Sequence, residues 1–242
     1  MTNHIVEKSQ HKAAGVAGFM FLFSFIVPTL NWAFVLSKLN VPENVAATAK
    51  NIMANELQFR IGLSIELIMA VGLVVLALAL YIILKPIGRN LALLAVLWKL
   101  AEATIAAVIV LGTFIALQLL NETAHITGFT PAQLQATVGF LLNEHTVLYS
   151  FPMVFLGLDM MVFSYLLFKS KYIPGILASF GILSFALILI HSFTTLIAPE
   201  YAMRLTIQTI CYTPSGIFEI IIGIWLLVKG LNVQKMDNHD PA

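Results

Sequence analysis

Residues 59–84 read FRIGLSIELIMAVGLVVLALALYIIL, and residues 91–120 read LALLAVLWKLAEATIAAVIVLGTFIALQLL after the short segment KPIGRN at 85–90. Each run exceeds the roughly 20 apolar residues that a helix needs to cross the hydrocarbon core of a bilayer. An α-helix satisfies all of its backbone polar groups internally, as the bilayer interior requires. The two runs therefore predict a pair of membrane-spanning helices joined by a short turn.

Comparable apolar runs continue through the chain. Of its 242 residues, 60% are hydrophobic and only 10% are charged, whereas soluble domains average about 45–50% and 25%. The first run is too long for the apolar part of a signal peptide and is followed by no A-x-A-like cleavage site. We therefore expect a single all-α polytopic membrane domain over residues 1–242. Its six transmembrane helices are predicted at about 13–36, 59–84, 91–120, 146–168, 174–196 and 213–231.

Lysine and arginine are unevenly divided between the two ends of the predicted bundle. The end with both termini and the 85–90 and 169–174 turns carries Lys8, Lys12, Lys85, Arg89, Lys169, Lys171, Lys229 and Lys235. The other end carries Lys38, Lys50, Arg60 and Arg204. Because cytoplasmic loops are enriched in cations, we expect a protein of the cell membrane with both termini in the cytoplasm.

Two of the outer connections are predicted to contain short amphipathic helices, at about 43–56 and 131–143. The second begins TPAQ at 130–133, which provides a threonine cap and a proline at the first helical position. Such helices either lie on the membrane surface or cover a cavity from above.

Several functional classes are not expected from this sequence. A net charge of +1 argues against nucleic-acid binding, and the single cysteine, Cys211, forms no internal disulfide. We find no H-x-x-x-H pair, phosphate-binding glycine loop or G-x-S-x-G motif. We therefore predict no metal and no cofactor. The expected partners are the lipid bilayer and a lipid or small amphiphilic ligand.

Three ionisable residues are predicted near the middle of the membrane: Lys99, Glu102 and Asp159. Lys99 and Glu102 lie roughly 12–17 Å from the cytoplasmic end of their helix and, three residues apart, share one face. Asp159 lies at a similar depth on the next helix. The trio is either a proton or cation relay, an anchor for a polar head group, or a buried salt bridge that fixes the register of two helices.

A second group is predicted nearer the outer surface, comprising Asn31, Arg60, Glu66, His191 and Glu219. Arg60 is expected to reach towards Glu66 or Glu219 as a multi-donor partner. Gly216 and Gly223 flank Glu219 and favour close helix packing there. The group is either an outward-facing pocket with a titratable histidine or a structural network of hydrogen bonds.

The sequence also resembles a known family. The segments KPIGRNLALLA at 85–95, KLAEA at 99–103 and YLLFKSKYIP at 165–174 are similar to the bacterial domain-of-unknown-function family 4386, as is Glu219 followed by GIWLLVKG at 223–230. Lys99, Lys171 and Gly175 stand where the family pattern leads us to expect arginine, glycine and arginine. The resemblance implies a six-helix membrane protein in which Arg60, Lys99, Glu102 and Glu219 are the preferred polar positions. It implies no activity.

Three functional hypotheses follow. The first is binding or transport of a small molecule or lipid through a polar cavity between the helices. The second is an intramembrane enzyme that acts on a lipid-like substrate, with His191 and either Glu66 or Glu219 as acid and base. The third is a scaffold or sensor subunit whose charges only fix the packing. Catalysis predicts His191 within hydrogen-bond distance of a carboxylate, and a scaffold predicts paired charges without a cavity.

Overall fold

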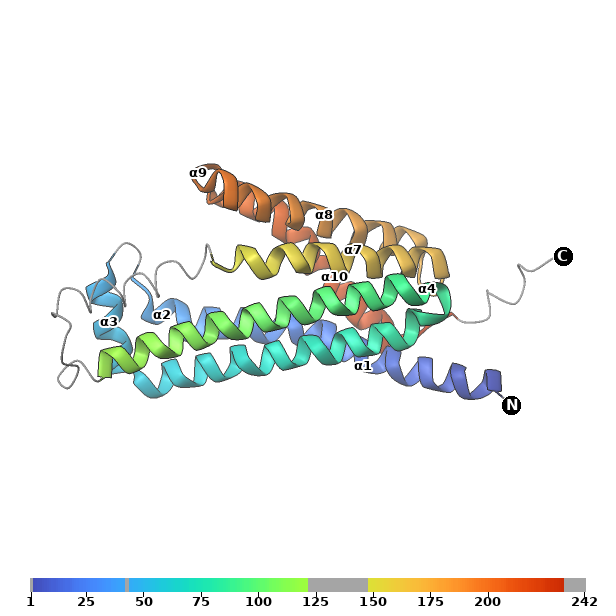
Figure 1. The fold of residues 1–242 in the computed structure, drawn as a ribbon, viewed down its shortest axis with the longest axis horizontal. Helices are drawn as coiled ribbons and strands as arrows, with labels where there is room; N and C mark the ends of the chain where they lie inside the picture. The colour runs from blue at the N-terminus through green and yellow to red at the C-terminus, as the bar shows by residue number, and fades with distance from the viewer. Residues whose placement is uncertain (1, 42–43, 122–147, 233–242) are drawn as a thin grey trace.

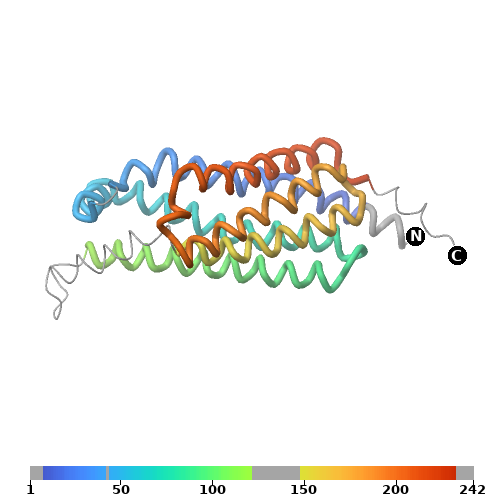
Figure 2. Tube along the Cα trace, turned by 90° about the horizontal axis from the view of Figure 1, so that it is seen from above, coloured from blue at the N-terminus to red at the C-terminus, as the bar shows by residue number. Residues whose placement is uncertain are grey.

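The computed structural model describes residues 2–41, 44–121 and 148–232, and every regular element in these ranges is a helix. The long helices run alongside one another in an elongated bundle, and α1 begins at the same end at which α10 finishes (Figures 1 and 2). α1 packs against α4 and α10, α7 against α4 and α8, and α8 against α10. The elements are α1 (Thr2–Asn31), the π-helix η1 (Trp32–Leu36), α2 (Ser37–Leu39), α3 (Val45–Ala54), α4 (Glu56–Asn121), α7 (Ser150–Ser170), α8 (Gly175–Ile197), α9 (Pro199–Ala202) and α10 (Leu205–Val228).

The surface of the bundle is suited to lipid. Within the described residues, five helical segments are long and apolar enough to cross a membrane, namely Lys8–Leu39, α4, α7, α8 and α10. Only 33–44% of the most apolar window of each is buried inside the protein, so most of these apolar side chains face outward. Exposure on this scale exceeds what a water-soluble protein shows. The chain is an all-α polytopic membrane protein, as the sequence predicted.

α4 differs from the expected turn at 85–90. Its 66 residues are helical except at Gly88 (φ −170°, ψ 82°), where the chain folds back on itself (Figure 1). The reversal lies inside the predicted 85–90 turn, but the non-helical backbone is confined to Gly88 and not spread over six residues. Pro86 lies in the last turn of the first arm, directly before the break. The two predicted spans form antiparallel arms, 56–87 and 89–121, and the total of six membrane crossings stays a prediction.

Of the two short helices predicted in the outer connections, one is present in the structure and the other falls outside the described residues. The one expected at 43–56 is α3, which begins after Asn44. The Asn44 side chain accepts a hydrogen bond from the Ala47 N–H at 2.9 Å, the usual stabilisation of a helix N-terminus. The one expected at 131–143 lies outside the described residues.

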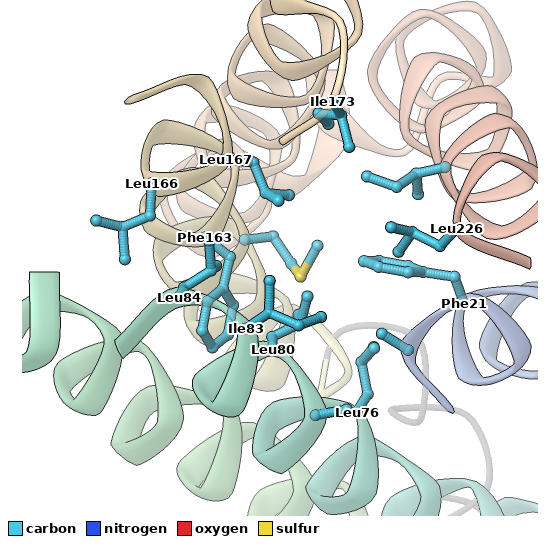
Figure 3. Packing of buried hydrophobic residues seen from close by; sticks show 14 of the residues in the cluster. Phe21, Leu76, Leu80, Ile83, Leu84, Phe163, Leu166, Leu167, Ile173 and Leu226 are labelled. Atoms are coloured by element: carbon cyan, nitrogen blue, oxygen red, sulfur yellow. The ribbon is translucent and has the colours of Figure 1, made fainter. Parts of the chain in front are cut away.

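The end of the bundle nearest the termini is filled by an apolar core. Figure 3 shows Phe163 and Leu167 of α7 facing Leu80 and Ile83 of the first arm of α4, with Phe21 of α1 close by. Beneath this core, the Gln10 side chain donates to the Ile83 carbonyl at 2.9 Å and to the Tyr172 hydroxyl at 3.2 Å. Tyr172 lies in the α7–α8 turn, so these bonds join three parts of the chain and close this end.

Candidate functional site

The bundle contains a cavity beyond the apolar core. Its volume is about 420 Å³, within the range of small-molecule sites. Phe21, Leu76 and Met160 belong both to the cavity wall and to the core, so the core forms the floor. The cavity reaches to Trp32 of η1 and to Tyr149 at the start of α7, in the direction of the end that carries α3. Its polar wall residues are Ser24, Glu66, Lys99, Glu102, Tyr149 and Glu219.

Lys99 lies at the centre of a buried ion network. Its Nζ is 2.7 Å from Glu102 Oε2 and 2.9 Å from Asp159 Oδ1. Glu102 lies one turn along the same helix, and Asp159 comes from α7, so the network links the second arm of α4 to α7. Lys99 and Asp159 are fully buried, and Lys99 and Glu102 line the cavity. The structure thus brings together the three residues that the sequence placed at similar depth.

Glu219 enters the cavity from α10. Its Oε2 accepts a hydrogen bond from the Ser24 hydroxyl of α1 at 3.3 Å. The two helices can approach this closely because glycines face the contact. A Cβ on Gly216 would lie 2.5 Å from Phe25 Cε2, and one on Gly223 would lie 2.8 Å from Leu22 Cγ. The glycines on either side of Glu219 therefore hold its helix against α1.

Glu66, from the first arm of α4, lines the same cavity. The sequence assigned Glu66 and Glu219 to an outer group and Lys99 and Glu102 to an inner one, and one cavity reaches residues of both groups. Counting residues from each helix end estimates the depth of a backbone position. It does not reveal an empty space that extends over several turns and receives side chains from both depths.

Arg60 lies away from the cavity. Its Nε is 2.7 Å from Glu56 Oε1, and its guanidinium lies 5.6 Å from the centre of the Phe114 ring. The expectation that Arg60 reaches Glu66 or Glu219 is therefore wrong. Glu56 had been assigned to the preceding connection, but it is the first residue of α4. This places it four residues before Arg60 on one helix face, the spacing at which opposite charges pair.

His191 and Asn31 have packing roles. The His191 Nε2 lies 3.1 Å from the Ala202 carbonyl oxygen, and its ring contacts the Tyr212 ring edge-on at 4.8 Å. Within the described residues, no carboxylate lies at hydrogen-bond distance from the imidazole, and His191 does not line the cavity. The Asn31 side chain donates to the Gly62 carbonyl at 3.1 Å, which ties α1 to α4.

Several wall residues were not singled out from the sequence. Phe21, Ser24, Pro28 and Trp32 recur every three or four residues and form one face of α1 and η1 along the cavity. Pro28 lacks a backbone N–H and disturbs the helix that carries it, and the π-helix η1 follows four residues later. The spacing of these four residues was the available signal. The methionines Met69, Met153 and Met160 also line the wall.

The family model described as Domain of unknown function (DUF4386) matches residues 16–230. Every residue of the cavity wall lies within this range. No curated protein and no solved structure matches the chain.

Proposed function

The chain belongs to the family described as Domain of unknown function (DUF4386), and we propose that it binds a small molecule or a lipid in the cavity. We propose further that it transports this ligand across the cell membrane. The proposal rests on one cavity of about 420 Å³ whose described wall combines apolar side chains with Lys99 and three glutamates. Binding sites for small molecules have this composition, in which apolar walls surround a few fixed polar groups.

The depth of the polar groups supports transport. Charged side chains are costly inside a bilayer and are found mainly along substrate or ion pathways. Glu66, Glu102 and Glu219 come from different helical segments of the bundle and converge on one space. A ligand can place its apolar part against Leu73 and Met153 while its polar part contacts a carboxylate.

The proposed orientation has both termini in the cytoplasm, supported by the excess of lysine and arginine at that end. In this orientation the cavity lies in the outer half of the membrane, and the core around Phe163 and Ile83 separates it from the cytoplasm. Transport then requires α1 and α10 to separate from α4 and α7 at this core. Because the core is packed in the described conformation, this conformation is closed to the cytoplasm.

The other two hypotheses have less support. The enzyme hypothesis needs His191 beside Glu66 or Glu219, and the contacts of His191 are instead with Ala202, Thr195 and Tyr212. The scaffold hypothesis predicts that no cavity is present. The paired charges of Lys99, Glu102 and Asp159 agree with a scaffold, but the cavity does not, and only the binding hypothesis accounts for it.

Native mass spectrometry with lipid and metabolite analysis of the protein in mild detergent tests the proposal. Ala106 lines the cavity, so Ala106→Leu fills part of it. Thr104 is exposed on the same arm and lies outside the cavity wall, which makes Thr104→Leu the matched control. We expect wild type and the control to retain a small molecule that Ala106→Leu loses. The proposal fails if no variant retains one, or if Ala106→Leu retains it equally.

A further inference from the structure

The charges around the cavity are predominantly acidic. Glu66, Glu102 and Glu219 line it together with one cation, Lys99. A fourth carboxylate, Asp159, contacts Lys99 from α7. In their ionised forms these five side chains carry more negative than positive charge, so the cavity favours a ligand that brings a positive charge.

Lys99 is not available to an anionic ligand. Its side chain is 0% exposed, and carboxylate oxygens of Glu102 and Asp159 lie 2.7 and 2.9 Å from its Nζ. A phosphate or carboxylate head group would have to displace one of these partners and would then lie beside the remaining acids. Among the described wall residues Lys99 is the only cation, and the protein's own carboxylates already balance its charge.

Glu219, in contrast, has a neutral partner. Its hydrogen bond comes from the Ser24 hydroxyl at 3.3 Å. In the described part of the chain, no lysine, arginine or histidine nitrogen lies within 4.0 Å of its carboxylate. An opposite charge nearby stabilises an ionised carboxylate far more in a low-dielectric site than in water. A cationic group of a ligand would supply that charge.

The walls fit the rest of such a ligand. Trp32, Tyr149 and Phe21 line the cavity, and aromatic faces attract organic cations. Met69, Met153 and Met160 add flexible, polarisable surface that adapts to different apolar shapes. Building on the proposed function, we infer that the ligand class is a lipophilic organic cation, an amine or onium compound, whose charge is bound by Glu219 in the cavity that Glu66 also lines.

Two probes of matched shape and opposite charge test this inference. Tetraphenylphosphonium and tetraphenylborate each present four phenyl rings around a central atom, and their binding to the purified full-length protein can be measured by equilibrium dialysis in neutral detergent. We expect the cation to bind at least tenfold more tightly than the anion. Glu219→Gln should weaken cation binding more than tenfold. Glu200→Gln, at an exposed position of α9 outside the cavity, should leave it unchanged.

The outcomes separate this inference from the proposed function. If the anion binds as tightly as the cation and Ala106→Leu abolishes both, the cavity is a ligand site but the cationic class is overturned. If cation binding survives both Glu219→Gln and Ala106→Leu, the cation does not use the cavity and the inference fails. If neither probe binds and wild type retains no molecule in native mass spectrometry, the proposed function itself fails. Thermal unfolding verifies that each variant is folded, and Glu66→Gln provides a second charge removal should Glu219→Gln not fold.

Discussion

Lys99 is enclosed by carboxylates from two helices, Glu102 on its own arm of α4 and Asp159 on α7. Because the three side chains are buried, the stability of each charge depends on the others. Removing one member of a buried ion pair leaves an uncompensated charge, which costs more than the pair itself contributes. This network is therefore the most sensitive polar feature of the fold.

We predict that Lys99→Met lowers the free energy of unfolding by about 3–5 kcal/mol, because it leaves Glu102 and Asp159 facing each other. Adding Asp159→Asn to Lys99→Met should restore part of the loss. Arg60→Met, which removes the exposed pair with Glu56, is the control and should have little effect. Denaturant unfolding in detergent measures all three. Equal losses for Lys99→Met and Arg60→Met would contradict the account.

Tyr172 lies in the turn between α7 and α8, outside the membrane spans. Burial raises the pKa of its phenol above the usual value near 10, while the hydrogen bond from Gln10 lowers the pKa by a smaller amount. Above pH 10 the unfolded chain therefore releases this proton before the folded protein does. The stability that Tyr172 provides is complete below pH 10 and is lost as the pH rises further.

Tyr172→Phe should lower the free energy of unfolding by about 1 kcal/mol at neutral pH, because Gln10 loses one hydrogen-bond acceptor. The variant should also lose less stability than wild type as the pH rises above 10. Thermal unfolding from about pH 8 to pH 11 compares wild type with this variant and with Tyr201→Phe at an exposed position. An unchanged alkaline slope in Tyr172→Phe would show that Tyr172 does not contribute to it.

At the scale of residues, sequence reasoning succeeded where the partners lie on one helix or at equal depth. The three-residue spacing of Lys99 and Glu102 and the similar depth of Asp159 were enough to group them. Arg60 was paired with the wrong acids because Glu56 was assigned to the outer helix predicted at 43–56, whereas it is the first residue of α4. The positions of helix ends depend on local hydrogen bonds that hydropathy does not report.

Among the helical elements, the contact between α1 and α10 depends on glycine. A Cβ on Gly18 would lie 2.8 Å from the Gly223 carbonyl oxygen and 3.0 Å from Leu226 Cβ. The first of these is a backbone atom, so it cannot move aside as a flexible side chain can. On the same helix, a Cβ on Gly15 would meet no atom within 4 Å. The two glycines form a matched pair of test positions.

Gly18→Ala should destabilise the protein by about 1–3 kcal/mol through overpacking. Because α10 carries Glu219, the displacement should also weaken ligand binding. Gly15→Ala should be neutral or stabilising by up to about 1 kcal/mol, since alanine favours the helix. Thermal unfolding of both variants decides the question, and a destabilised Gly15→Ala with a neutral Gly18→Ala would rule out the proposed close contact.

The apolar runs predicted the long helices well because each is long enough to be recognised by hydropathy alone. The reversal within α4 was harder to place. The segment KPIGRN interrupts the apolar pattern over residues 85–90, so hydropathy indicated a reversal there but not that the break is confined to Gly88. Proline residues were visible in the sequence, but the π-helix that follows Pro28 contacts α4, and the sequence does not show such contacts between distant segments.

The orientation of the whole molecule is open to a direct test. In a Cys211→Ser background, Lys38→Cys and Lys169→Cys place single thiols at exposed positions at opposite ends of the bundle. We predict that a membrane-impermeant maleimide labels Lys38→Cys in intact cells and labels Lys169→Cys only after lysis. The reverse pattern would place the termini outside the cell and the cavity in the cytoplasmic half.

The cavity itself is a property of the assembled bundle. Its wall takes residues from α1, η1, both arms of α4, α7 and α10, and no single helix reveals by its periodicity that the space between them is unfilled. The sequence supplied the polar residues that point to a site. Only the packing of the helices reveals which of them share it, and that His191, Arg60 and Asn31 do not.

The most direct measurement is an experimental structure of the protein extracted with its native lipids into nanodiscs. We predict non-protein density between Trp32 and Glu219, in contact with Phe21 and Met160, in wild type and in Thr104→Leu. The same density should be missing from Ala106→Leu. A wild-type structure in which the surrounding side chains have closed over an empty or vanished cavity would contradict the proposed ligand site.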